Sequence, residues 1–173
     1  MLSGTSCVSQ VDRSPGLPAG SSLASAQPTG VPPGDLLIAH VAGRPALTVE
    51  LARTDAERAR GLMDRQRLAS RRGMLFVFPE TTTTGFFMYR TLVPLSIAWV
   101  DRGRIVAVAE MTPCRESDPA DCPTYHPGQP YTSAIEAPEN FFTTGGSAVG
   151  AAVRITPLAG GFGLTVDASS YAE

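Results

Sequence analysis

Lysine is absent from this 173-residue chain, and charged residues of all kinds make up only 17% of it. The 14 positive charges are therefore all arginine, and the formal net charge is -2. A nucleic-acid-binding protein usually carries a basic stripe or patch, and this sequence contains none. We therefore expect no nucleic acid among its partners.

Long apolar runs are also missing. No segment reaches the roughly 20 apolar residues that span a bilayer, and no charged start precedes an apolar stretch as it would in a signal peptide. Apolar residues nevertheless make up 43% of the chain, which is enough to build the core of one domain. We expect that single domain at residues 35–157.

The two ends of the chain differ from this middle part in composition. Residues 1–34 are rich in proline, glycine and serine, and they offer too little apolar surface to offset the entropy of ordering. We therefore predict a disordered tether there. Residues 158–173 either add an edge strand, at about 162–166, or form a tail.

Cysteine is scarce, and the three cysteines differ in their surroundings. Cys114 and Cys122 lie in one proline-containing segment with seven residues between them, so a loop can bring their sulfurs within bonding distance. We predict a disulfide between them. Cys7 is left over and is either a free thiol or the lipid-bearing cysteine of a bacterial lipoprotein. Small residues before Cys7 and the tether after it suit a lipoprotein, whereas Gly4 stands where an aliphatic residue is usual.

A metal site is the alternative use of this cysteine pair. Cys114, Cys122 and His126 follow a C-x7-C-x3-H pattern, but the cysteines of structural zinc sites usually lie two to four residues apart. We therefore favour the disulfide and expect neither a metal nor a cofactor. A disulfide and a tether together predict an extracytoplasmic protein, whose contact with the membrane would be limited to a lipid on Cys7.

Strand signals dominate the domain, and one short helix is indicated. Thr54 and Glu57 have capping-box spacing, which predicts a helix from Asp55 to Arg60. A second short helix is expected at 138–142. A long loop occupies residues 111–130, and β-prone runs bounded by turn residues cover 36–42, 47–52, 74–78, 85–90, 95–100, 104–110, 131–137 and 152–156. This pattern predicts a mainly β sandwich or barrel.

Three motifs occur in a fixed order: R-G-L-M-D-R at 60–65, G-M-L-F-V-F at 73–78 and T-L-V-P-L-S-I at 91–97. They resemble the pattern of a bacterial and archaeal family known as domain of unknown function 192. The resemblance extends from Leu47 to Ile155. It implies a jelly-roll-like β-sandwich with one or two short helices, and it implies no particular activity.

The chain departs from the family pattern at three polar positions. Tyr89, Arg90 and Ser96 stand where the family usually has lysine, asparagine and aspartate. These changes would disable a family active site built on those residues, so we expect no catalytic residues. The ligand-binding candidates are then Arg65, Tyr89, Arg90, Tyr125 and Glu136.

Taken together, the sequence predicts an exported or lipid-tethered β-sandwich protein that acts as a ligand-binding or envelope-associated module. Its partner would be a small molecule, a glycan or an envelope protein. The alternative is a hydrolase-type enzyme that uses Glu110, Glu136, His126 or a bound metal. Because the chain has no G-x-S-x-G motif and no obvious carboxylate pair, binding is the favoured role.

Overall fold

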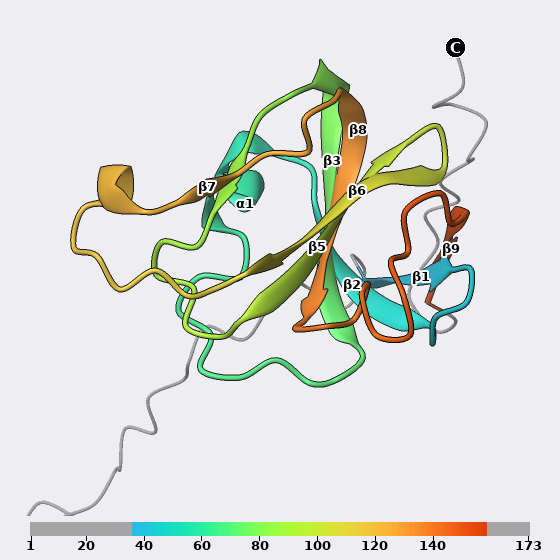
Figure 1. Cartoon of the computed structure of the whole chain (residues 1–173), viewed down its shortest axis with the longest axis horizontal. Helices are drawn as coiled ribbons and strands as arrows, with labels where there is room; N and C mark the ends of the chain where they lie inside the picture. The colour runs from blue at the N-terminus through green and yellow to red at the C-terminus, as the bar shows by residue number, and fades with distance from the viewer. Residues whose placement is uncertain (1–35, 159–173) are drawn as a thin grey trace, which may run out of the picture.

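The computed structural model describes residues 36–158 (Figure 1). The tether expected at 1–34, the edge strand or tail expected at 158–173 and Cys7 lie outside the described residues, apart from Leu158.

Seven strands of the described chain form one sheet in the order β6-β5-β8-β3-β2-β1-β9. All neighbours are antiparallel except β2 and β3, which run parallel. The strands are β1 (Leu36–Val41), β2 (Leu47–Ala52), β3 (Arg72–Thr82), β5 (Leu95–Asp101), β6 (Arg104–Met111), β8 (Tyr131–Pro138) and β9 (Val153–Pro157).

The sheet curls until its two outer strands meet at one end. Arg104 at the start of β6 forms an isolated bridge with Ala152, and the Ile105 amide donates to the Ala151 carbonyl at 3.0 Å. The fold is therefore mainly β and of the barrel or sandwich kind, as the sequence predicts.

Helix α1 (Asp55–Arg60) connects the two parallel strands. A parallel pair needs a crossover connection, and a helix is the usual solution. The predicted capping box is present, because the Glu57 amide donates to Thr54 Oγ1 and the Thr54 amide donates back to Glu57 Oε2 at 2.8 Å. Gly61 then ends the helix with a φ of 48°, a left-handed value that favours glycine.

Apolar side chains gather on both faces of the curled sheet, because alternate residues of a strand point to opposite faces. All seven strands contribute to the inner cluster, which fills the inside of the curl; its buried members include Leu37, Leu47, Val49, Leu75, Ala98, Val100, Ile105, Ile135 and Phe142. The outer cluster lies on the other face, and its buried members include Leu62, Met74, Phe76, Met88, Leu95, Ile97, Trp99, Met111 and Tyr131.

A small separate sheet lies over the outer cluster. Strand β4 (Phe86–Phe87) pairs antiparallel with β7 (Thr124–Tyr125), and α1 lies in the same part of the molecule, opposite β1 and β9 (Figure 1). The predicted disulfide is present, with 5.7 Å between the Cα atoms of Cys114 and Cys122. It closes the loop that contains the short 3-10 helix η2 (Pro119–Asp121).

Three local expectations need correction. The strand expected at 85–90 is only two residues long, and the loop expected at 111–130 supplies its partner strand. Residues 138–142 form turns rather than a helix, because Asn140 has a left-handed φ of 65°. Strand β3 continues past Pro79 to Thr82, and its register with β8 shifts there because proline has no amide to donate.

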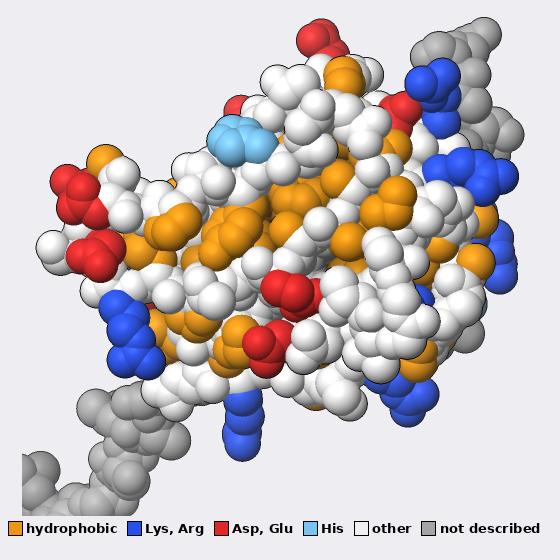
Figure 2. All heavy atoms as spheres, viewed as in Figure 1, with side chains coloured by type: hydrophobic (Ala, Val, Ile, Leu, Met, Phe, Trp, Pro, Cys, Tyr) orange, Lys and Arg blue, Asp and Glu red, His pale blue; other side chains and the backbone are white. Residues whose placement is uncertain are grey.

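Strand β6 is an outer strand of the sheet, and it lies on the side of the molecule that Figure 2 shows. Its central residues, from Val106 to Ala109, are apolar and only partly buried, and a band of hydrophobic side chains crosses this face. The Gln129 side chain covers part of that edge by donating to the Val106 carbonyl at 2.7 Å.

Candidate functional site

A cleft of about 500 Å³ opens between α1, the second half of β3 and β4. It lies on the outer side of the sheet, where the small β4–β7 sheet leaves part of the outer cluster open. Aromatic and aliphatic side chains line about half of its walls, including Leu62, Met63, Phe76, Phe78, Phe86 and Phe87. Threonines and charged residues form the rest of the lining, and a concave site that combines apolar walls with polar groups is the usual form of a small-molecule site.

Two buried polar residues line this cleft, Thr91 and the ionisable Glu136. Glu136 lies on β8 opposite Met74 of β3 and Ile97 of β5, and its exposed fraction is 5%. Among residues 36–158, none forms a hydrogen bond with its carboxyl group. Burial raises the pKa of Glu136 to about 8, although the nearby Arg65 guanidinium opposes this.

Arg65 and Glu50 form an ion pair beside this carboxyl. Glu50 on β2 lies opposite Met74, so Glu50, Met74 and Glu136 form one row across three strands on the outer face. The two terminal guanidinium nitrogens of Arg65, Nη1 and Nη2, each donate to one Glu50 oxygen at 2.6 Å. This bond raises the pKa of Arg65, and Glu50 is itself 5% exposed. The pair is bidentate, the geometry that an arginine and a carboxylate favour.

A second ion pair fixes the loop that carries Arg65. Arg90 donates from Nε and Nη2 to the Asp64 carboxylate at 2.9 and 3.1 Å, and the Asp64 amide donates to the Arg90 carbonyl at 2.8 Å. Asp64 and Arg90 both have left-handed φ values, 63° and 53°. These bonds hold the turn at Asp64 against the turn at Arg90, and this fixes the position of the neighbouring Arg65.

Three phenylalanine rings form the aromatic wall of the cleft. The Phe86 ring meets the Phe76 ring edge-on, with centroids 5.1 Å apart, and the Phe78 ring at 6.4 Å. The Arg58 guanidinium lies over the Phe78 ring, 5.2 Å from its centroid. One cation is thus already held against this wall, as expected for a cation–π contact.

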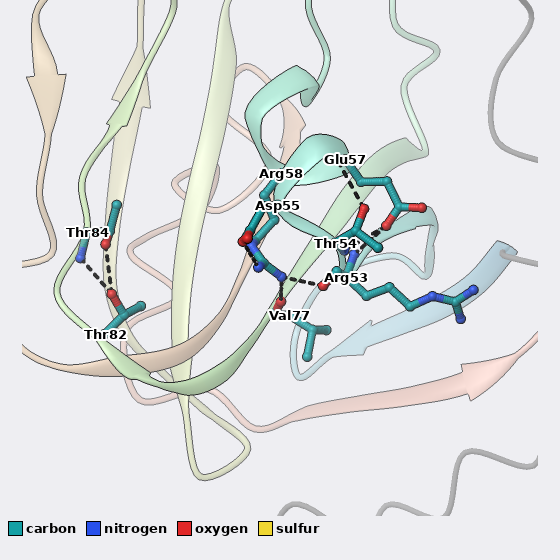
Figure 3. A network of polar contacts seen from close by, with 8 residues as sticks. All are labelled: Arg53, Thr54, Asp55, Glu57, Arg58, Val77, Thr82 and Thr84. Carbon is teal, nitrogen blue, oxygen red and sulfur yellow. Dashed lines mark hydrogen bonds and ion pairs between the residues drawn. The ribbon is translucent and has the colours of Figure 1, made fainter.

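Arg58 also ties α1 to β3 at the rim of the cleft (Figure 3). It donates to the Val77 carbonyl at 2.7 Å and pairs with Asp55 at 2.5 Å. At the far end of β3, the hydroxyls of Thr82 and Thr84 are 2.8 Å apart. These contacts hold the rim in place. The Arg58 charge is paired with the Asp55 carboxylate.

A family model for uncharacterized proteins, called domain of unknown function 192, matches residues 37–155. The chain belongs to this family. Among curated proteins, none matches the chain. In the part of the chain that the structure describes, no helix has the length and apolar character needed to cross a membrane.

Two solved structures are similar to this family member. One is a protein of Sinorhizobium meliloti 1021 described as a candidate transcription regulator, with 28% identity and a TM-score of 0.59 over 69% of this chain and 91% of that one. The other is a protein of unknown function from Novosphingobium aromaticivorans DSM 12444, with 27% identity and a TM-score of 0.60 over 69% of this chain and 84% of that one.

Of the five predicted ligand-binding residues, the structure brings together Arg65 and Glu136. Arg90 does not pair with either of them; it forms an ion pair with Asp64, the residue that precedes Arg65. Tyr89 and Tyr125 lie on the β4–β7 side. The Tyr89 ring stacks on Phe87, and the Tyr125 hydroxyl accepts a hydrogen bond from the Thr112 amide at 3.1 Å. Neither tyrosine lines the cleft.

The residues of the alternative enzyme are spread apart. Glu110 accepts hydrogen bonds from Ser96 Oγ, Thr143 Oγ1 and the Asn140 amide, all between 2.8 and 2.9 Å, so it fixes the turn after β8. His126 lies against Gly85 and forms no hydrogen bond with either glutamate in the described chain. Within residues 36–158, no three His, Cys, Asp or Glu side chains are grouped to hold a metal ion.

Sequence reasoning missed Glu50, the partner of Arg65. The signal was a single glutamate inside the apolar run of residues 47–52, where an ionised side chain needs a partner if both faces of the strand are buried. Only the parallel pairing of β2 with β3 places Glu50 in the same row as Glu136.

Proposed function

We propose that this protein is a binding module whose small-molecule ligand occupies the cleft beside Glu136. The observation that carries the proposal is Glu136, a residue only 5% exposed that lines a cleft of about 500 Å³ and whose carboxyl has no hydrogen-bond partner among the described residues.

The cost of such a carboxyl is the reason to infer a ligand. A buried polar group without a partner destabilises the fold by about 1–3 kcal/mol, so almost all such groups in proteins are paired. Where a protein keeps one in a cleft, a ligand is the natural partner. The phenylalanine walls supply apolar surface for the rest of that ligand.

We further propose that the protein works outside the cytoplasm, either secreted or anchored by a lipid on Cys7. The disulfide supports this, because such bonds persist in oxidising compartments. Fractionation of the source cells, with mass spectrometry of the peptide that contains Cys7, tests it. A reduced Cys114 in a cytoplasmic pool would contradict the proposal. A binding partner in the cell envelope, or a glycan, fits the same location.

Nucleic acid binding is not part of the proposal, although one structural relative is described as a candidate transcription regulator. Several arginines of this chain are already engaged, since Arg58, Arg65 and Arg90 each pair with a carboxylate. The net charge of -2 also gives the chain no overall excess of positive charge to attract a phosphate backbone.

The test is a ligand screen on the full chain that reports on Glu136 directly. Carbon-13 labelling of glutamate gives each carboxyl carbon an NMR signal whose pH titration yields its pKa. A cleft ligand should shift the Glu136 signal, and the Glu136→Gln variant should lose that ligand. Glu139→Gln changes an exposed glutamate three residues away and should bind normally. If ligands bind equally to both variants, their site is elsewhere and the proposal fails.

A hydrolase is the second candidate, and one observation favours it. A carboxyl whose pKa is raised to about 8 keeps its proton at neutral pH, as a general acid must. Of the glutamates and histidine named for this role, only Glu136 lines the cleft. Turnover of chromogenic ester or glycoside substrates that disappears in Glu136→Gln but persists in Glu139→Gln would establish it.

A further inference from the structure

We propose that the ligand of this cleft is an organic cation, an ammonium or alkylated amine, whose positive charge is paired by the Glu136 carboxylate and held against the phenylalanine wall. The inference rests on the binding function proposed above and names the class of ligand.

The charges around Glu136 leave one position for a cation. Arg65 is the nearest guanidinium, but both of its bonds go to Glu50, so that pair is neutral as a unit. When Glu136 ionises, the buried group of Glu50, Arg65 and Glu136 carries one uncompensated negative charge. A ligand that brought a second negative charge would increase this imbalance, whereas a cation would remove it.

The charged residues on the rim of the cleft also favour a cation over an anion. Its charged residues are Asp55, Glu80, Arg58 and Arg60, so the rim is balanced and the excess charge of the cleft comes from Glu136. Arg58 is bound to Asp55 and to the Val77 carbonyl. Arg58 is therefore engaged, and the charge of Arg60 is matched by that of Glu80, so the rim as a whole carries no excess positive charge for a small anion.

The aromatic walls of the cleft favour a cation, as the negative charge of ionised Glu136 does. Phe76, Phe78 and Phe86 line one wall, where Phe86 packs edge-on against the other two rings at centroid distances of 5.1 and 6.4 Å, and aromatic rings attract cations electrostatically through their faces. Phe78 already holds the Arg58 guanidinium on one face. Alkyl groups on a ligand nitrogen would gain from the same rings by burying apolar surface.

Proton release is the distinctive consequence. In the empty protein the carboxyl is neutral below about pH 8, because burial raises its pKa and Arg65 only partly offsets this. A cation binds the ionised form, so one proton leaves Glu136 for the solvent while the ammonium keeps its charge. Affinity should therefore rise about tenfold per pH unit below pH 8 and level off above it. A neutral ligand accepting the carboxyl proton would show the opposite trend.

The groups that face Glu136 allow this trend to be assigned. Arg65 and Glu50 lie beside it, and Asp55, Arg58, Arg60 and Glu80 lie on the rim. The hydrogen bonds to Glu50 raise the pKa of Arg65, which therefore stays charged throughout. A pH dependence between pH 6 and 8 that disappears in Glu136→Gln would accordingly belong to Glu136.

Three probes of similar size and different charge test the inference on the full chain. Choline is the cation, 3,3-dimethyl-1-butanol is its neutral analogue and 3,3-dimethylbutyrate is its anionic one. Calorimetry in two buffers of different ionisation enthalpy gives the affinity and the protons released. We expect choline to bind at least tenfold more tightly than either analogue at pH 8. We also expect it to release close to one proton at pH 6.5 and to weaken at least tenfold in Glu136→Gln, with no change in Glu139→Gln.

The outcomes separate this inference from the proposed function. If the alcohol or the acid binds as tightly as choline and still shifts the Glu136 carboxyl signal, the cleft binds ligands but the cation assignment is wrong. If choline binds without proton release, or equally well to Glu136→Gln, the assignment is also wrong. If no probe and no ligand of the wider screen shifts that signal, the binding function itself fails. Circular dichroism of each variant confirms that it is folded.

Discussion

The two faces of the curled sheet each bury a polar side chain, and they treat it differently. On the inner side, Ser96 of β5 donates to Glu110 at 2.8 Å and accepts from the Phe142 amide at 3.3 Å, so its hydroxyl is fully used. On the outer side, Glu136 of β8 has no hydrogen-bond partner among the described residues and lines a cleft. Neighbouring strands of one sheet thus carry one satisfied and one unsatisfied group.

This difference separates architecture from function. Ser96 and Glu110 lock the turn after β8 onto the inner cluster, which is otherwise apolar. Glu136 makes no such connection, and its burial works against folding. A protein keeps an unfavourable group where the group has a use. We therefore expect changes to the inner side to alter mainly stability, and changes to the residues that line the cleft to alter mainly binding.

The largest expected effect is on the inner side. Phe142 is fully buried there, so Phe142→Ala should lower the free energy of unfolding by about 3–5 kcal/mol. Phe86 is only partly buried and lines the cleft, so Phe86→Ala should cost clearly less while weakening ligand binding. Chemical denaturation of both variants measures the difference. Equal losses of stability would remove the distinction between the two faces.

A somewhat smaller effect is expected at the ion pair of the outer side. Arg65→Met removes the partner of a nearly buried carboxylate, and breaking such a pair costs about 3–5 kcal/mol when both charges are buried. Because Arg65 is partly exposed, we expect about 2–4 kcal/mol. Arg65→Met combined with Glu50→Gln should recover much of the loss, since no unpaired charge remains. A double variant no more stable than Arg65→Met would show that the pair's charge is unimportant.

Much of the fold follows from local patterns in the sequence. The capping box of Thr54 and Glu57 fixed the start of α1, and alternation or short apolar runs located the strands of the main sheet. The two faces of β3 are both buried, which is why residues 74–78 are uniformly apolar. The disulfide was also predictable, because its two cysteines lie close together in the sequence.

The site was less predictable because it depends on long-range pairing. Arg65 and Glu50 are 15 residues apart and meet only because α1 returns the chain to a parallel strand. Glu136 joins them from β8, far along the chain. Composition identified Arg65 and Glu136 as candidates, but it could not show that Tyr89 and Tyr125 would be used on the β4–β7 side.

Removing the disulfide tests whether the cover of the outer face is separate from the core. The Cys114 amide donates to the Met88 carbonyl at 3.3 Å, so the bridged loop is attached next to β4. Replacing Cys114 and Cys122 by serine should cost about 2–3 kcal/mol, mostly by freeing the unfolded chain. Hydrogen exchange should increase in β4 and β7 before it increases in β5. Uniform loosening of both faces would contradict this.

The effect most specific to Glu136 is the pH dependence of stability. Burial raises the pKa of Glu136 from an ordinary value near 4.5 to about 8, so between these values the native protein holds a proton that the unfolded chain has lost. Stability therefore decreases as pH rises through this range, by up to about 1.4 kcal/mol per pH unit, and it is affected no further above pH 8.

Glu136→Gln removes this dependence because glutamine does not titrate. Its free energy of unfolding, measured by urea denaturation, should exceed that of the original protein increasingly from pH 5 to pH 8, whereas Glu139→Gln should follow the original protein. A saturating cation should flatten the curve of the original protein in the same range, since it stabilises the ionised carboxyl. If the original protein and Glu136→Gln keep a constant difference from pH 5 to pH 8, the carboxyl is already ionised at neutral pH. In that case a group on the outer face would stabilise the Glu136 carboxylate, as Glu110 and the Phe142 amide satisfy the Ser96 hydroxyl on the inner face.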